Sequence, residues 1–201
     1  MPLRLFVALS LPDQLREELS AIATGISGAK WIRPANYHLT LRFIGEVQNW
    51  QAEEIDEALA GIRARGFELS LHGLGLFERL GRPSTLWVGA ERNDSLTHLQ
   101  NKIETALRRA GLSAERRRFA PHVSLARVEQ ADPGKVVSYL QTHNLFRARP
   151  VEVESFTLFS SLLGKECATY VPEVDYELAQ RRELPERPAR LIPPHPYAFA
   201  G

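Results

Sequence analysis

The sequence predicts an α+β fold made of two similar lobes, with two antiparallel sheets facing each other across a central cleft and the helices outside. Two observations predict it. Strand-like and helix-like segments follow one another in the order strand, helix, strand, helix, strand in each half of the 201-residue chain. A histidine, an apolar residue, a hydroxyl residue and another apolar residue also occur together in the second strand of each half. The two copies are His38–Leu41 and, 84 residues later, His122–Leu125. The repeated order and the repeated pattern together indicate a duplicated unit.

The first half begins with a strand over residues 4–11, where apolar residues on both faces predict a buried position. Pro12 and Asp13 then open a helix that we expect to run to about residue 26. Leu15, Leu19 and Ile22 have the spacing of its buried face. The later elements of this half are a strand at 38–47, a helix at 51–65, and strands at 67–77 and 85–90 around a turn at 81–83.

The second half repeats this order and contains a helical pattern over residues 94–110. Its apolar face is formed by Leu96, Leu99, Ile103 and Leu107, and Gly111 stops it. The remaining elements are a strand at 122–128, a helix at 133–143, and strands near 151–163 and 167–178.

We expect one bilobal domain over residues 1–180 and a separate C-terminal tail over residues 181–201. Five of the thirteen prolines fall between Pro185 and Pro196. Proline lacks the backbone N–H that a helix or a central strand needs, so the tail is interpreted as an extended arm or a disordered end.

Composition narrows the class of protein. The net charge is +1, so any anionic partner must be held by a local patch of cations rather than by the charge of the whole protein. The single cysteine, Cys167, excludes an internal disulfide and fits a reducing compartment. No segment has the length of a membrane span or the pattern of a signal peptide. We therefore expect a cytoplasmic monomer with no membrane partner.

The two four-residue patterns carry the candidate chemistry. Residues i and i+2 of a strand share a face, so His38 lies beside Thr40 and His122 beside Ser124. If the two strands meet, two imidazoles and two hydroxyls converge on one small space. Imidazole titrates near pH 6.5 and serves as acid or base, while hydroxyls donate to the non-bridging oxygens of a phosphate. The pattern therefore predicts proton transfer around a phosphate.

The residues around both motifs resemble a known family. Residues 31–45 read WIRPANYHLTLRFIG and residues 118–127 read RFAPHVSLAR. With RLFVAL at 4–9 and LFSS at 158–161, they are similar to the signatures of the two-histidine phosphoesterases. Within that family they resemble the RNA 2′,3′-cyclic phosphodiesterases, formerly called 2′-5′ RNA ligases. The resemblance spans residues 3–178. Ser124 stands where the family usually has threonine, and it keeps the hydroxyl.

The resemblance implies an enzyme that opens a terminal 2′,3′-cyclic phosphate of RNA to a 2′-phosphate by breaking the bond to O3′. It implies that His38 donates a proton to O3′, that His122 accepts a proton from water, and that no metal or other cofactor takes part. It also implies ligation as the reverse reaction, which we rank second because release of ring strain favours hydrolysis. The residues themselves leave the two histidine roles open, since the site is nearly symmetric.

Arginines near the motifs are candidates for holding phosphate. Arg127 matches a family arginine that contacts phosphate, but strict alternation places it opposite His122 unless the strand ends or bulges first. Arg42 shares the parity of His38, which makes it the simpler geometric candidate, with a position beyond the cleft in solvent as the alternative. Arg116–Arg118 come just before the second motif and are a candidate groove for an RNA backbone.

Four aromatic residues are candidates for stacking on a terminal base, and core packing is the alternative for each of them. They are Phe6, Tyr37, Trp87 and Phe119. Two other functions stay open at this point. One is a phosphoesterase that acts on small cyclic nucleotides, and the other is a nucleotide-binding module without turnover. None of the other histidines has the close spacing of a zinc pair.

Overall fold

The computed structural model describes residues 3–164 and 168–180. Its helices are α1 (Asp13–Ile22), the short 3-10 helix η1 (Pro34–Asn36), α2 (Asn49–Ala60), α3 (Asp94–Arg109) and α4 (Pro133–His143). Its strands are β1 (Leu3–Ser10), β2 (Lys30–Trp31), β3 (His38–Val47), β4 (Phe67–Leu69), β5 (Leu71–Arg79), β6 (Arg82–Ala90), β7 (His122–Arg127), β8 (Val151–Val153), β9 (Ser155–Leu163) and β10 (Ala168–Glu177). The predicted α+β class is confirmed.

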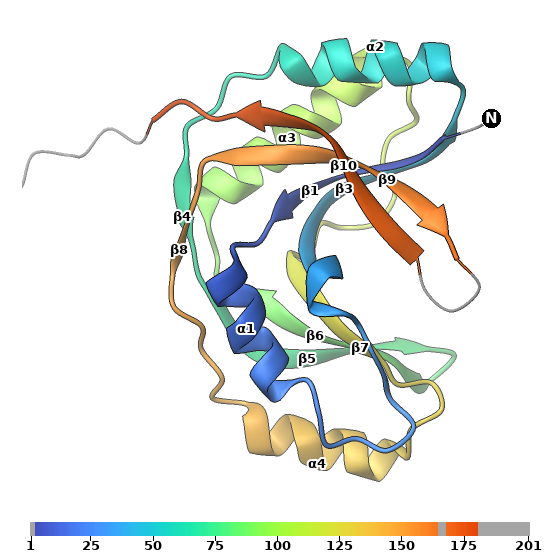
Figure 1. Ribbon diagram of the computed structural model, residues 1–201, viewed down its shortest axis with the longest axis vertical. Helices are drawn as coiled ribbons and strands as arrows, with labels where there is room; N and C mark the ends of the chain where they lie inside the picture. The colour runs from blue at the N-terminus through green and yellow to red at the C-terminus, as the bar shows by residue number, and fades with distance from the viewer. Residues whose placement is uncertain (1–2, 165–167, 181–201) are drawn as a thin grey trace, which may run out of the picture.

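The strands of the described residues form one large antiparallel sheet in the order β10-β9-β1-β3-β7-β6-β5, with β2 added beside β7. β4 and β8 make a separate two-stranded pair. Within the large sheet, β3 and β7 are joined through one backbone pair, Leu39 with Val123. The two expected sheets are therefore two halves of a continuous sheet that is narrowest at this pair, and the strands splay apart on either side of it (Figure 1).

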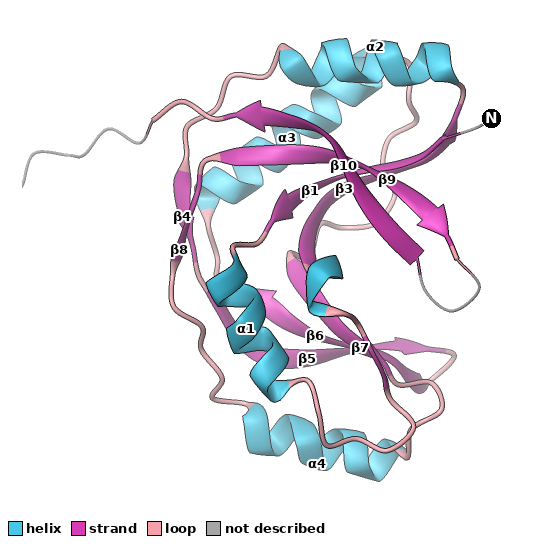
Figure 2. Cartoon of the chain, in the orientation of Figure 1, coloured by secondary structure: helices cyan, strands magenta, loops and turns pink. Residues whose placement is uncertain are grey.

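The two lobes do not correspond to the two halves of the sequence. The first lobe contains β1 and β3 from the start of the chain and β9 and β10 from its end, because β1 pairs with both β3 and β9. The second lobe contains β2, β5, β6 and β7. Helices α2 and α3 lie with the first lobe and α1 and α4 with the second, outside the strands (Figure 2). Each lobe is thus built from segments far apart in the sequence.

Burial of one side of each element explains why these segments form. All four residues predicted for the apolar face of α3 are buried. The Asn93 side chain accepts a hydrogen bond from Leu96 N at 3.0 Å and so caps the helix start. Each fully buried leucine of this kind contributes about 1.5–3 kcal/mol relative to an exposed one. These four buried residues therefore anchor α3 against the back of the first lobe.

Some boundaries differ from the prediction. α1 ends at Ile22 rather than residue 26, since the chain turns before Gly25, whose φ is +89°. α2 spans Asn49–Ala60, with Gly61 as its C-cap, and so ends five residues before the expected end. The predicted tail at 181–201 lies outside the described residues. Within the described part, no helix is long and apolar enough to cross a membrane.

Candidate functional site

The meeting of β3 and β7 brings the two motifs together. Leu39 and Val123 are antiparallel partners in the middle of their motifs. Extending this register by one residue in each direction places His38 opposite Ser124, and Thr40 opposite His122. Opposite residues on neighbouring antiparallel strands have their Cα atoms about 5 Å apart. Two imidazoles and two hydroxyls therefore line one small area, related by an approximate two-fold axis through the Leu39–Val123 pair.

Both histidine rings are held in the same way. His38 Nδ1 lies 2.8 Å from the carbonyl oxygen of Asn36, and His122 Nδ1 lies 2.7 Å from that of Ala120. A carbonyl oxygen only accepts, so in each ring Nδ1 carries the hydrogen and donates it. The neutral ring then has its free lone pair on Nε2. Each Nε2 is thus prepared to accept a proton, or to donate one when the ring is protonated.

Aromatic residues surround the histidines. His38 lies against Phe6 (4.9 Å between ring centroids), Tyr170 (5.0 Å) and Phe159 (6.4 Å). On the other side of the site, His122 lies against Phe77 at 4.8 Å and Trp87 at 5.9 Å. These rings exclude water from the flanks of both imidazoles.

This environment favours the neutral form of both rings. Burial lowers the pKa of His38 below its usual value of 6.5, and the neighbouring His122 lowers it further, while the bond to Asn36 O opposes the shift. Burial also lowers the pKa of His122, against the opposing effect of its bond to Ala120 O. The histidines are therefore mainly uncharged near pH 7 when no anion is bound.

The two motif hydroxyls are free to bind a ligand. Thr40 and Ser124 are both half-buried. Within residues 3–164 and 168–180, neither hydroxyl makes a side-chain hydrogen bond. Each hydroxyl can therefore donate to an oxygen that enters the space between the histidines.

A β-bulge in β3 overturns the parity argument for Arg42. Ala8 of β1 pairs with Thr40, but the next residue, Val7, pairs with Arg42, so Leu41 is an extra residue in the ladder. The bulge reverses the alternation beyond it. Arg42 consequently shares the core face of Val7, and the prediction that it faces the cleft with His38 is wrong.

Arg42 is instead part of a buried ionic cluster, with its side chain 8% exposed. Its Nε donates to Glu104 at 2.6 Å, its Nη2 to Ser113 O at 2.5 Å and its Nη1 to Phe43 O, and Glu115 lies 3.6 Å from Nη1. A buried charge needs such partners. The cluster ties β3 to α3 and to the loop that leads to the second motif.

An equivalent bulge in β7 brings Arg127 onto the cleft face. Trp87 of β6 pairs with Ser124, whereas Thr85, two residues earlier on the same face of β6, pairs with Arg127. Leu125 is the extra residue, and the alternation reverses beyond it. Arg127 thus lies on the face of His122 and Ser124. Its exposed guanidinium makes no ion pair in the part of the chain that the structure describes.

The other sequence candidates divide between core and surface. Phe6 and Tyr37 are buried in packed clusters, and Phe119 is packed against the core, whereas Trp87 lies beside His122. Arg116–Arg118 are exposed, and they come before β7, at the opposite end of that strand from Arg127.

Sequence reasoning missed Phe77, Phe159 and Tyr170 as neighbours of the histidines. The motif signatures include Phe159 in LFSS, but its strand reaches His38 only through pairing with β1, which the sequence does not display. Phe77 is near because β5 pairs with β6, and β6 with β7.

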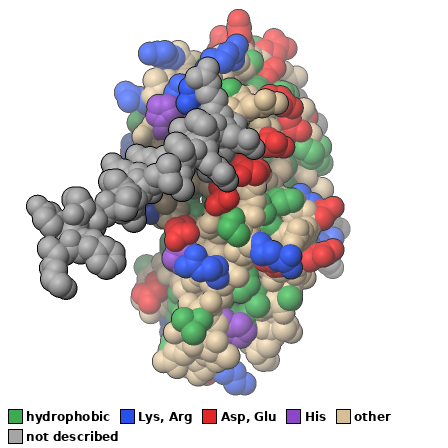
Figure 3. All heavy atoms as spheres, turned by 90° about the vertical axis from the view of Figure 1, so that its left-hand side faces the viewer, with side chains coloured by type: hydrophobic (Ala, Val, Ile, Leu, Met, Phe, Trp, Pro, Cys, Tyr) green, Lys and Arg blue, Asp and Glu red, His purple; other side chains and the backbone are tan. Residues whose placement is uncertain are grey.

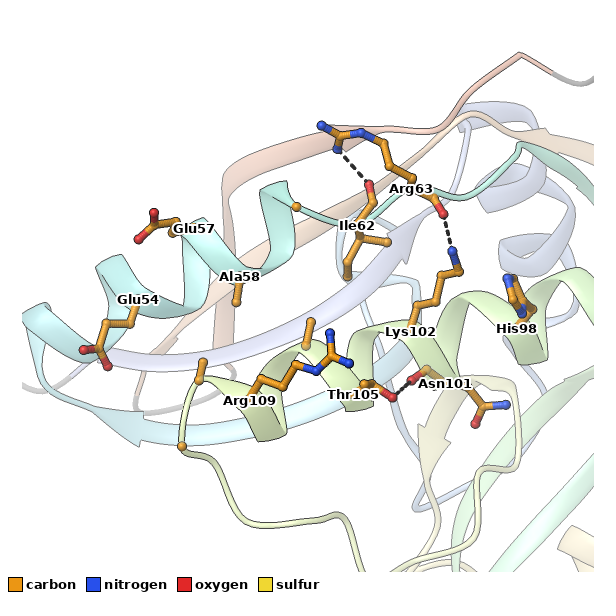
Figure 4. Close-up of a pocket in the computed structure, with 14 residues that line it drawn as sticks. Glu54, Glu57, Ala58, Ile62, Arg63, His98, Asn101, Lys102, Thr105 and Arg109 are labelled. Carbon is orange, nitrogen blue, oxygen red and sulfur yellow. Dashed lines mark hydrogen bonds between the residues drawn. The ribbon is translucent and has the colours of Figure 1, made fainter.

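Hollows on the surface of the described residues include two that differ in their distance from the motifs. One, of about 380 Å³, lies beside His122 and is lined by Phe77, Trp87 and Pro121, among others. A larger one, of about 970 Å³, lies between α2 and α3. There Lys102 Nζ donates to Arg63 O at 2.5 Å, and Glu54 and Glu57 flank the other end (Figure 4). No motif residue lines the larger hollow, so the smaller one is the candidate ligand space.

Charge on one further face of the molecule is mixed. The face that points away from the β5–β6 and β9–β10 hairpins carries interspersed acidic and basic side chains (Figure 3). No group of three or more histidine, cysteine or carboxylate side chains in the described part of the chain is arranged to hold a metal ion. Cys167 lies outside the described residues.

Comparison with known proteins gives consistent matches. The model of the LigT-like phosphoesterase family matches residues 9–87 and 88–170. An RNA 2′,3′-cyclic phosphodiesterase of Archaeoglobus fulgidus is 32% identical over 84% of this chain and 96% of its own length. One of Aeropyrum pernix is 38% identical over 70% and 81%. The crystal structure of Escherichia coli LigT complexed with 3′-AMP is similar with a TM-score of 0.74 and 26% identity, covering 90% of this chain and all of that one.

Proposed function

Because the chain belongs to the LigT-like phosphoesterase family, we propose that it hydrolyses the 2′,3′-cyclic phosphate at the end of an RNA to a 2′-phosphate. One observation carries the proposal. Two histidines, each with Nδ1–H bound to a carbonyl two residues upstream, face one space together with two hydroxyls that have no side-chain hydrogen bond among the described residues. This arrangement presents two equivalent proton-transfer groups to a small anion.

The chemistry requires one histidine in each protonation state. His122 Nε2 removes a proton from a water molecule as that water attacks phosphorus. The bond from phosphorus to O3′ breaks, and His38 Nε2–H gives its proton to the departing O3′. One water is consumed, the ring opens to a 2′-phosphate and a 3′-hydroxyl, and the proton is returned from His122 to His38 through solvent. General acid–base steps of this kind contribute about 10²–10⁴-fold each.

Charge develops on the non-bridging oxygens during the attack. The hydroxyls of Thr40 and Ser124 donate to these oxygens, and the guanidinium of Arg127, which forms no ion pair with any described residue, lies on the same face. A bound anionic phosphate also raises the pKa of the neighbouring histidine. Substrate binding therefore favours the protonated histidine that acts as the acid, whereas burial disfavours this form in the empty site.

The allocation of the two roles follows the family resemblance, since the site is close to symmetric. We also propose that the protein acts in the cytoplasm as a monomer. Joining of a 5′-hydroxyl end in place of water is the reverse reaction, and hydrolysis predominates in water because opening the strained ring is favourable.

The experiment is to incubate the full chain and EDTA with a short single-stranded RNA ending in a 2′,3′-cyclic phosphate, to follow ring opening by mass spectrometry, and to distinguish the isomeric products with a phosphatase specific for 3′-phosphate ends. We expect a 2′-phosphate end. A 3′-phosphate end contradicts the proposed bond cleavage. Turnover of nucleoside 2′,3′-cyclic phosphates but not of the RNA instead supports a small-nucleotide phosphoesterase, and binding without product supports a non-catalytic module.

A further inference from the structure

A row of cationic and aromatic side chains follows the cleft face of the second lobe, away from His122. On β6, Trp87 and Thr85 share this face because they pair with Ser124 and Arg127. On β5, Phe77 pairs with Thr85, and Arg79 lies two residues further along the same face.

This face carries two pairs of cations, and the two members of each pair occupy opposite positions on neighbouring strands. Arg79 pairs with Arg82 at the end of the β5–β6 hairpin, and Lys30 of β2 pairs with Arg127 of β7. All four side chains are exposed, and none makes an ion pair with a described residue. Like charges at opposite positions destabilise an antiparallel pair. Such pairs are suited to an anion that lies across both strands.

The turn that joins β5 to β6 has a leucine at a position whose backbone conformation does not suit leucine. Leu80 and Gly81 form a two-residue turn with positive φ at both positions, +54° and +72°. Asparagine or glycine is strongly preferred at the first of these positions, and leucine is strained there. The Leu80 side chain is 97% exposed. Backbone strain of this kind tends to cluster at functional sites, which makes this tip a candidate for binding.

An aromatic platform connects this tip to His122. A Cβ atom on Gly75 would lie 2.1 Å from the ring of Trp87, so glycine at this position lets the indole lie against the backbone of β5. Phe77 contacts that indole at 5.3 Å. Both rings also contact His122. The platform therefore begins at the catalytic histidine and ends where the arginines begin.

We propose that the hairpin track, defined as Phe77, Arg79, Leu80, Arg82 and Trp87, holds the single-stranded body of the RNA whose cyclic end lies between the histidines. Cationic side chains that follow a backbone and aromatic rings that stack on bases are the usual combination for binding single strands. The track runs along β5 and β6 for about 17 Å at 3.3 Å per residue. The hairpin projects freely beyond the sheet (Figure 1), which leaves room for the RNA. This inference rests on the proposed hydrolysis of RNA ends.

The test compares two substrates, uridine 2′,3′-cyclic phosphate and a single-stranded hexauridylate with the same cyclic end. For the double variant R79A/R82A, we expect KM for the hexanucleotide to rise about 10-fold, with kcat and the constants for the mononucleotide unchanged. The slope of log KM against log salt for the hexanucleotide should fall by about 1.4, because two phosphate contacts to a single strand are lost.

Two further double variants serve as controls. R92A/K135A removes two exposed cations that are not on the cleft strands, and should leave both substrates unaffected. R116A/R118A tests the alternative that the RNA backbone binds along Arg116–Arg118, which come before the second motif. Equal losses on both substrates by R79A/R82A, no loss at all, or a length-dependent loss confined to R116A/R118A would each overturn the proposal. Absence of turnover by the unaltered protein would instead sink the proposed function itself.

The turn provides an independent measurement. Replacing Leu80→Asn gives an Asn-Gly turn suited to positive φ, so thermal stability should increase while KM for the hexanucleotide also increases. A purely structural role for Leu80 predicts the stability gain with unchanged KM, and that result would remove Leu80 from the track.

Discussion

Leu41 and Leu125 are the extra residues of two equivalent β-bulges, each two positions beyond the residue at which β3 and β7 pair. Both bulges reverse the alternation of their strand. As a result, Phe43 follows Thr40 onto the cleft face in one motif, and Arg127 follows Ser124 onto it in the other. The pairing of Phe43 with Phe6 and their stacked rings, 5.7 Å apart, agree with this placement. The near-symmetric site therefore has a cation, Arg127, on the side of the second motif, where the first motif has Phe43.

Replacing Arg127→Ala should lower kcat/KM for a cyclic phosphate by about 10²-fold, because its guanidinium is placed to stabilise charge on the non-bridging oxygens. Stability should change by less than about 0.5 kcal/mol, since the side chain is exposed and unpaired within the described chain. Steady-state kinetics and thermal unfolding measure the two effects. Arg127→Lys should restore part of the activity, and a variant as active as the parent would exclude a role for this arginine.

Replacing Arg42→Met should mainly lower stability, whereas replacing Arg127→Ala should mainly lower activity. It leaves Glu104 and Glu115 without their shared cation, and we expect a loss of about 2 kcal/mol of unfolding free energy, less than for a fully buried pair because both carboxylates are partly exposed. Urea unfolding measures this loss. The double variant R42M/E104L should lose less than the sum of the two single variants, because the residues form one cluster. Additive losses would contradict coupling.

Those two arginines show how far the sequence could be interpreted. Periodicities of 2 and 3.6 located the longer strands, the four helices longer than one turn in the described residues, and the two motif faces, because these periodicities are local properties. They missed the two-residue strand β2 and the breaks that separate β4 from β5 and β8 from β9. A bulge is not local, since it is defined by the register of two strands that lie far apart in the sequence. Strict alternation consequently placed Arg42 in the cleft and Arg127 outside it, and the structure reverses both.

The surroundings of the histidines were hidden for a similar reason. Phe159 and Tyr170 reach His38 because β9 returns from the end of the chain to pair with β1. The expected duplication assigned each lobe to one half of the sequence, whereas both lobes draw strands from both halves. A pattern in one strand predicts which face a residue occupies, but not which distant strand will cover it.

The pH dependence follows from the lowered pKa values of the two histidines. In the free enzyme one ring must be protonated and the other neutral, and both pKa values lie below 6.5. We therefore expect a bell-shaped profile of kcat/KM with its maximum below pH 6.5. The profile of kcat should lie at higher pH, because the bound phosphate anion raises the pKa of the acid. A profile that is flat from pH 5 to 9 would argue against two-histidine proton transfer.

Burial by the aromatic residues can be tested directly at His38. Replacing Tyr170→Ala opens one side of this ring, so its pKa, followed by NMR titration, should move up towards 6.5. The pKa of His122 should move much less, because its own aromatic neighbours are Phe77 and Trp87. Equal shifts of both histidines would point to a general loosening of the fold.

The acid and base can be distinguished by changing the leaving group. A 3′-deoxynucleoside 2′-phosphodiester of p-nitrophenol has no neighbouring hydroxyl that could attack phosphorus, and water displaces an anion that needs no proton, so a general acid is dispensable for its hydrolysis, whereas a base is still required. His38→Ala should then keep most of its activity on this ester while losing about 10²–10⁴-fold on a cyclic phosphate. His122→Ala should lose activity on both. The reverse pattern would exchange the two roles, and losses by both variants on both substrates would show that His38 also binds the phosphate.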